Sequence, residues 1–264
     1  MATPTKPLLV ATPTQTPARF GLLSVAQIVS EPDPHWQNGV EYTANPLVEV
    51  VDALNVDCTV DPDDDWPEGL DQVTDPPLRI RTGFTCKHPG LTAEDIHSYA
   101  SAKLSAAEGP SVEAAVWDQI AATSVATPAG TSAIGIVTAV GDLEAWLWTT
   151  YPGVGVLHMP RDVAVAAVAA DVVKLRDGRL ETALGTPVAA GAYPGTGPAA
   201  TTSGEAWIGA TGAVVLRRSE PRVYTDNAAA YFDYHTNEVF GVAERIYVAS
   251  FEDVRAVALV DLPD

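Results

Sequence analysis

The sequence predicts an α+β protein, and three features of the chain support this prediction. Residues 206–216, 238–250 and 254–262 form long apolar runs without proline, rich in Val, Ile and small side chains, which suits packed strands. Upstream, apolar residues recur at helical spacing across 91–120. Between these regions, residues 137–188 read as helix, strand, helix, hairpin and strand, which together make a compact α+β unit.

The length and composition are those of a globular protein. A chain of 264 residues and 27.7 kDa buries about three-quarters of its extended surface, so its core needs neither cross-links nor a metal. Hydrophobic residues make up 47% and charged residues 19%, which excludes a disordered chain, and 21 prolines with 20 glycines indicate many loops. We expect one or two subdomains.

The charge balance argues against nucleic-acid recognition. The formal net charge is −19, and the 15 basic residues are spread over the whole length, whereas phosphate binding needs clustered Lys and Arg. An acidic wall repels DNA, which suits a container whose contents must not adhere to it, and equally suits any soluble acidic protein.

Neither a membrane span nor a secretory signal is expected. No apolar run reaches the length of about 18 residues that a spanning helix needs. The N-terminus carries one Lys and a short apolar patch interrupted by prolines, which is not the apolar core of a signal peptide. We therefore expect synthesis and retention in a cytoplasm.

The N-terminal region predicts an extended arm followed by a hairpin. Residues 1–19 hold four prolines among Thr and Ala, a pattern that prevents a helix and favours either an extended arm or a disordered tail. Residues 20–44 read as two strands around the turn-rich segment EPDPHWQNG. Within it, His35 beside Trp36 is typical of a loop histidine packed on an aromatic ring.

The next region predicts a long, projecting acidic hairpin between the strand-like runs 47–56 and 78–85. Part of it, Asp61 to Asp65, touches the pattern of a calcium loop, but Trp66 stands where the loop needs Gly and no Glu follows at position twelve. We therefore interpret it as a solvated loop without a metal. Its eight acidic residues are Asp57, Asp61, Asp63, Asp64, Asp65, Glu68, Asp71 and Asp75.

Residues 91–120 predict the main helix. Thr92 and Asp95 resemble a capping box at its start. Gly109-Pro110 interrupts the apolar stripe, because proline removes a backbone donor and clashes with the preceding turn, so the choice is between one kinked helix and two helices at an angle.

A small-residue linker at 123–131 marks a subdomain boundary before the compact unit. The unit comprises helices at 137–150 and 160–170, a buried strand at 154–159, a hairpin with Asp177-Gly178 as its turn, and the segment LGTPV at 184–188. Residues 192–205 are expected to form a flexible loop.

The run 238–250 carries the one charged pair embedded in an apolar strand. Glu244 and Arg245 are adjacent, so they point to opposite faces and each needs another partner. Neither face of the strand is purely polar, which predicts cover on both sides by its own domain or a neighbouring subunit. Our hypothesis is that at least one of the two forms an ion pair between subunits.

No catalytic motif is apparent. The chain lacks HExxH and GxSxG, its Gly-rich segments lack the Lys-Ser/Thr of a phosphate loop, and its five histidines are scattered singly. His158, at the end of a buried strand, is typical of a satisfied core histidine. Cys58 and Cys86 have neither CxxC nor His-spaced partners, so we expect no zinc, no cofactor and no enzymatic activity.

The order LGTPV, a Gly/Pro-rich loop, AWI…AVVLRR, RVYT, NEVFGVAER and AVALVDL resembles the C-terminal half of tailed-bacteriophage major capsid proteins, in an actinobacteriophage-like form. The resemblance implies the α+β Hong Kong 97-like shell fold. It implies an N-terminal arm (1–19), a hairpin and extended-loop region (20–90), a spine helix of the peripheral domain (91–123), an axial domain (124–216), peripheral strands (217–250) and a C-terminal strand returning to the axial domain (251–264).

The resemblance also implies a function and partners. The chain would assemble with many copies of itself, as pentamers and hexamers, into an icosahedral head around double-stranded DNA, inside the host bacterial cytoplasm. A separate scaffolding protein, a portal and a decoration protein are expected partners. With only Lys6, Lys87, Lys103 and Lys174 available, a loop-lysine cross-link to a neighbour is not expected.

Three alternatives stay open. An encapsulin-type nanocompartment would share the fold, but prolines in residues 1–19 forbid the helix with which encapsulins begin. A minor virion protein and a small α/β enzyme built on residues 137–188 are the other two alternatives.

Cys58 and Cys86 stand near the two ends of the acidic loop, so antiparallel pairing would bring them together, and a disulfide could form after release from the reducing cytoplasm.

Overall fold

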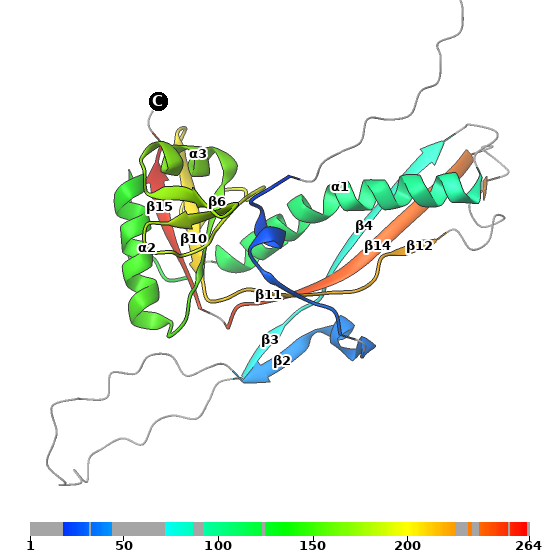
Figure 1. The fold of residues 1–264 in the computed structure, drawn as a ribbon, viewed down its shortest axis with the longest axis horizontal. Helices are drawn as coiled ribbons and strands as arrows, with labels where there is room; N and C mark the ends of the chain where they lie inside the picture. The colour runs from blue at the N-terminus through cyan, green and yellow to red at the C-terminus, as the bar shows by residue number, and fades with distance from the viewer. Residues whose placement is uncertain are drawn as a thin grey trace, which may run out of the picture.

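The structure is a computed structural model, and it describes residues 18–31, 33–43, 72–86, 92–122, 125–224, 232–233, 238–252 and 254–262. Figure 1 shows two parts that lie side by side along the longest axis. One part is an elongated layer in which α1 lies along the strands β4 and β14, here called the helix–sheet layer. The other is a compact lobe that contains α2, α3 and a second sheet.

The helix–sheet layer is built on the long strand β14 (Glu238–Ser250), which the sequence predicted with the same bounds. It pairs with β4 (Leu78–Cys86) along nine positions, and on its other edge with β11 (Val215–Arg218) and β12 (Arg222–Tyr224). The short strands β1 (Gln27–Val29) and β13 (Phe232–Asp233) complete the sheet, β1 running parallel to β11.

The helix α1 (Ala93–Ile120) covers one face of this sheet by packing on β4 and β14. Its capping box forms as predicted: the Thr92 side chain accepts from the Asp95 backbone N–H at 3.1 Å, and the Asp95 carboxylate accepts from the Thr92 N–H at 2.9 Å. Pro110 lies inside one continuous helix of 28 residues, so the alternative of two separate helices is wrong.

The compact lobe has a five-stranded sheet in the order β5-β15-β10-β6-β9. The helices α2 (Ile136–Thr150) and α3 (Arg161–Ala169), and the hairpin β7–β8, appear where the sequence predicted them. Asp177 and Gly178 form the hairpin turn with φ of 48° and 81°. The remaining strands are β5 (Ile134–Gly135), β6 (Val156–Pro160), β7 (Val173–Arg176), β8 (Arg179–Thr182), β9 (Val188–Gly191), β10 (Glu205–Thr211) and β15 (Arg255–Asp261).

Two strand predictions were wrong. The run 206–216 is not one strand: β10 ends at Thr211, and β11 begins at Val215 in the other sheet. The break falls at Gly212, where an added Cβ would lie 3.1 Å from the Tyr151 ring and 3.2 Å from the Phe251 carbonyl. The apolar composition continues across this break, so the sequence pattern does not indicate where the chain changes sheet.

Residues 20–44 do not form a hairpin with themselves. They form the 3-10 turns η1 (Leu22–Ser24) and η2 (Pro34–Asn38) and the strands β1 and β2 (Val40–Thr43). β1 pairs with β11. β2 pairs with β3 (Gln72–Asp75), and in the sequence these two strands precede and follow the acidic segment. Long-range partners thus override the local turn signal. The four-proline arm, the run 47–56, the calcium-like Asp61–Asp65 and Cys58 lie outside the described residues.

The core consists of two clusters that meet across the lobe sheet. Ala206, Ile208 and Ala210 of β10 face α2 and α3, whereas Trp207 faces the second cluster with Trp117 of α1. The chain passes from the lobe sheet to the β14 sheet between β10 and β11, and it returns to the lobe sheet between β14 and β15. The domain boundaries at 216/217 and 250/251 stay predictions.

Candidate functional site

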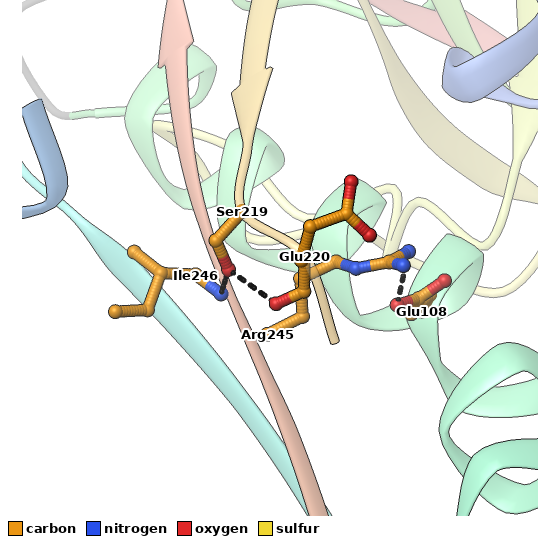
Figure 2. Close-up of polar contacts among 5 residues, drawn as sticks. All are labelled: Glu108, Ser219, Glu220, Arg245 and Ile246. Atoms are coloured by element: carbon orange, nitrogen blue, oxygen red, sulfur yellow. Dashed lines mark hydrogen bonds and ion pairs between the residues drawn. The ribbon is translucent and has the colours of Figure 1, made fainter. Parts of the chain in front are cut away.

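The charged pair on β14 divides between the two faces of the sheet, as its spacing predicted. Arg245 points toward α1, where its Nη1 atom lies 2.8 Å from Oε1 of Glu108 (Figure 2). Both side chains are mostly buried, with 15% and 9% of their surfaces exposed. The two atoms lie at ion-pair distance, but Oε1 of Glu108 forms no well-aligned hydrogen bond with any described residue. Burial raises the pKa of Glu108, and Arg245 opposes that rise.

Sequence reasoning missed Glu108, although a signal was present. Ile96, Ala100, Leu104, Val112, Val116 and Ile120 follow one another at intervals of four or eight, and Glu108 fills the gap in that row. A carboxylate in a buried helical row requires a cationic partner. The partner could not be read from the sequence, since Arg245 lies more than 130 residues further along the chain.

Glu244 points away from α1 and also has a hydrogen-bond partner within the subunit. Its carboxylate accepts a short hydrogen bond from the Tyr224 hydroxyl of β12, and Glu244 is only 7% exposed. This hydrogen bond is the main cause of the raised pKa of Tyr224. Glu244 and Arg245 therefore both have partners inside the subunit, and the ion pair between subunits stays a prediction.

Next to Arg245, the chain crosses from β11 to β12 along the edge of β14. The Ser219 hydroxyl accepts from the Ile246 N–H at 3.1 Å and donates to the Glu220 carbonyl at 3.1 Å, as Figure 2 shows. The Ser219 hydroxyl thus supplies an acceptor for the Ile246 N–H where the pairing of β14 passes from β11 to β12.

A second buried carboxylate, Glu113 of α1, holds three segments together. It accepts from the Leu22 N–H at 2.9 Å and from the Ala192 N–H at 2.6 Å. Gly21 and Gly191 make this approach feasible, because a Cβ at either position would lie within 2.4 Å of an atom of the carboxyl group. Glu113 thus fixes the start of the N-terminal segment and the end of β9 on the helix.

His158 is a satisfied core histidine, as predicted. It is fully buried on β6, and its ring nitrogens lie 3.0 Å from the Tyr193 hydroxyl and 2.9 Å from Oγ1 of Thr211. Burial lowers the pKa of His158 to about 3, so the ring is neutral near pH 7. The segment 192–205, predicted as a flexible loop, has no helix or strand before β10 begins at Glu205, and parts of it pack on the core. Tyr193 is buried, and the carbonyls of Thr196 and Ala199 accept from Trp117 and Trp207.

The compact lobe also holds a largely apolar groove of about 760 Å³ between α2 and the β8–β9 turn. One of the two carboxylates that line it, Glu144, accepts from the hydroxyls of Thr182 at 2.5 Å and Thr186 at 2.8 Å. No Cys or His lines it. Across the residues that the structure describes, no group of three or more His, Cys, Asp or Glu is placed to hold a metal ion. No described helix is long and apolar enough to cross a membrane.

Comparison with known proteins assigns the fold. No protein-family model matches the sequence, and no curated protein matches it significantly. Among solved structures, the capsid of Ralstonia phage GP4 matches with a TM-score of 0.53 and 11% identity, over 91% of this chain and 88% of that chain. The capsid of the native GTA particle matches with a TM-score of 0.52 and 14% identity, over 98% and 96%.

Mycobacterium phage Che8 matches with a TM-score of 0.50 and 13% identity, over 96% of each chain. The chain therefore has the Hong Kong 97-type capsid fold over nearly its whole length. The resemblance to that fold predicts that α1 is the spine helix, that the helix–sheet layer is the peripheral domain and that the compact lobe is the axial domain, and this assignment stays a prediction.

Proposed function

We propose that the chain is a major capsid subunit that assembles with many copies of itself into the icosahedral head of a tailed bacteriophage. The observation that carries this proposal is that the match to phage and GTA capsids extends over more than nine-tenths of the chain. The side chains of His158 and Glu144 have hydrogen-bond partners within the subunit, which supports a structural role over a catalytic one.

Electron microscopy of the purified protein tests this function. Closed particles of uniform diameter are expected, with five- and six-fold clusters of subunits. A monomeric protein at concentrations of tens of micromolar, with scaffolding protein present, would contradict the proposal. Copy number per virion separates a major subunit, present in hundreds of copies, from a minor virion protein. Packaged enzyme cargo in place of double-stranded DNA would indicate an encapsulin-type shell.

The finer partners belong to the same proposal. We infer a separate scaffolding protein, a portal and a decoration protein, with assembly in the host bacterial cytoplasm and residence in the virion. Co-purification of particles from infected cells, followed by mass spectrometry, would identify them. Absence of a portal from DNA-filled heads would contradict this set.

The proposed late disulfide joins Cys58 and Cys86. Cys86 ends β4, and Cys58 belongs to the segment bracketed by β2 and β3. Non-reducing mass spectrometry of released particles should give a mass two hydrogens lower than that of the reduced subunit. Two free thiols per subunit would eliminate the bond.

The ion pair between subunits remains a proposal for Glu244 and Arg245. Replacing Arg245 by Met leaves the buried carboxylate of Glu108 without its cationic partner. We therefore expect a loss of about 3 kcal/mol in the free energy of unfolding. The double variant Arg245→Met/Glu108→Leu should recover most of it. If Arg245 also pairs with a neighbour, the double variant will unfold normally as a subunit yet form less stable particles. Equal particle stability would exclude the intersubunit role of Arg245.

A further inference from the structure

The groove beside α2 is lined by one side of that helix. Val137, Gly141, Ala145 and Trp148 follow one another at intervals of four, four and three residues, which places them in one row on the helix surface, and all of them line the groove. The buried residues of α2 form a second row, which packs on the lobe sheet. α2 therefore has an apolar row beyond the one that the lobe core covers, whereas a surface helix needs only one.

Large apolar side chains around this groove are exposed to water. Trp148 is 85% exposed and Leu184 is 80% exposed, and more than half of the surface of Val137 and of Val154 is exposed. These residues come from three segments: α2, the loop before β6 and the turn between β8 and β9. Single exposed apolar residues are ordinary on a protein surface, but several of them around one groove indicate a surface that a partner covers.

The charged residues that line the groove are both acidic. Asp171 is paired with Lys174 at 3.2 Å. Glu144 accepts from the hydroxyls of Thr182 and Thr186, and no Lys or Arg in the described ranges lies within ion-pair distance of it. A carboxylate can accept about four hydrogen bonds, so the two hydroxyls use only part of its capacity. Glu144 therefore presents a negative charge that is available to a cationic group of a ligand.

The dimensions of the groove favour a helical segment over a small molecule. From Val137 to Trp148 the row rises by about 17 Å along the helix axis, which is the length of three turns. Between these two residues lie Gly141 and Ala145, and a Cβ built on Gly141 meets nothing within 4 Å, so a second helix has room to lie against α2. A small molecule inside the groove would leave the outer surfaces of Trp148 and Leu184 in water.

Charge favours a basic partner over a second copy of this chain. The formal net charge is −19, so a cationic segment is attracted over a long range, whereas another copy brings the same net charge. No basic residue lines the groove. A helix with one apolar side and a Lys or Arg at the edge of that side complements both the apolar row of α2 and the carboxylate of Glu144.

We propose that the groove beside α2 is a docking site for an amphipathic helical segment of a basic partner protein. The apolar side of the segment packs on Val137, Trp148 and Leu184, and its Lys or Arg forms an ion pair with Glu144. The two threonine hydroxyls hold the carboxylate in place for this pairing. The site lies within one subunit, so the inference goes beyond the proposed function and does not require that copies assemble.

Peptide binding to the unassembled subunit tests the site. The probe is a fluorescent, hydrocarbon-stapled helix of about fifteen residues, with Leu at helical spacing on one side, Gln on the other and a single Lys at the border. Fluorescence anisotropy should show saturable binding by the wild type and a loss of about tenfold in affinity for Trp148→Ala, because a large aromatic contact is removed. The matched control is Val165→Ala in α3, an exposed apolar residue outside the groove, which should bind normally.

A double-mutant cycle tests the ion pair. Glu144→Gln keeps an acceptor for one threonine hydroxyl but removes the negative charge, so it should weaken binding of the Lys peptide about tenfold. A second peptide with norleucine in place of Lys should bind the wild type and Glu144→Gln equally. Asp142→Asn makes the same change of charge on α2 outside the groove, and it should leave the affinity for the Lys peptide unchanged.

Four results would overturn the proposal. Failure of the Lys peptide to bind the wild type at millimolar concentration, or equal binding by the wild type and Trp148→Ala, would exclude docking of a helix at this groove. Equal loss of affinity for both peptides in Glu144→Gln would exclude the ion pair. Binding of octylamine as tight as that of the Lys peptide would assign the groove to a small amine. Self-association of the wild-type subunit in sedimentation that Trp148→Ala abolishes would assign the groove to a contact between copies.

Discussion

Glu113 is the residue on which the junction of three segments depends. Its carboxylate satisfies two backbone N–H groups that are otherwise removed from water. Replacing it by Ala leaves both donors without an acceptor, and we expect a loss of about 3 kcal/mol in the free energy of unfolding, measured by urea denaturation of the unassembled subunit. Glu113→Gln retains one acceptor oxygen and should lose clearly less. Equal losses for the two variants would contradict the role of the hydrogen bonds.

His158 makes the stability of the subunit depend on pH. The unfolded chain binds a proton at this residue below pH 6.5, whereas burial holds the pKa in the folded state at about 3. Folding is therefore opposed as pH falls through this window, by about 1.4 kcal/mol for each pH unit. The penalty is absent above pH 6.5 and reaches its full size near pH 3.

The measurement compares unfolding free energies of wild type and His158→Gln between pH 7 and pH 4. Gln retains hydrogen-bonding atoms but does not titrate, so the variant should be the less stable at pH 7 and should lose less stability on acidification. The difference between the two curves removes the contributions of carboxylates such as Glu108. Parallel curves would show that His158 does not titrate as its burial requires.

At the scale of the elements, two glycines allow one substitution to be compared in two settings. Gly141 lies inside α2 and Gly178 lies in the β7–β8 turn with φ of 81°, and an added Cβ meets nothing within 4 Å at either position. Any effect of Gly→Ala is therefore a backbone effect. In the helix it should stabilise by about 0.5–1 kcal/mol, and in the turn it should destabilise by about 1–2 kcal/mol.

Thermal unfolding of the two single variants checks this prediction. Opposite shifts of the melting temperature are expected, upward for Gly141→Ala and downward for Gly178→Ala. A downward shift for Gly141→Ala would mean that the backbone is not helical at Gly141, because only a helical backbone there gains from alanine.

At the scale of the whole molecule, the two clusters of the core share the lobe sheet, so the two parts should unfold together. Gly209 of β10 lies at this junction, and a Cβ there would approach Cγ2 of Ile120 to 2.8 Å. Gly209→Ala should cost about 2 kcal/mol by overpacking. Far-UV circular dichroism and tryptophan fluorescence should report one coincident transition for wild type and variant. Two separated transitions would contradict a shared core.

The sequence by itself determined the local elements whose signals lie in neighbouring residues. The capping box of α1, the alternation of β14, the turn at Asp177-Gly178 and the buried strand of His158 all follow from spacing within a few positions. The order of these elements was also sufficient to predict the shell fold.

Tertiary structure alone decided which distant segments meet. It divided the run 206–216 between two sheets, paired β1 and β2 with distant strands in place of a local hairpin, and joined Glu108 to Arg245. The physical reason is that local patterns fix the direction of a side chain relative to its own strand, whereas its partner depends on long-range packing of strands far apart in sequence.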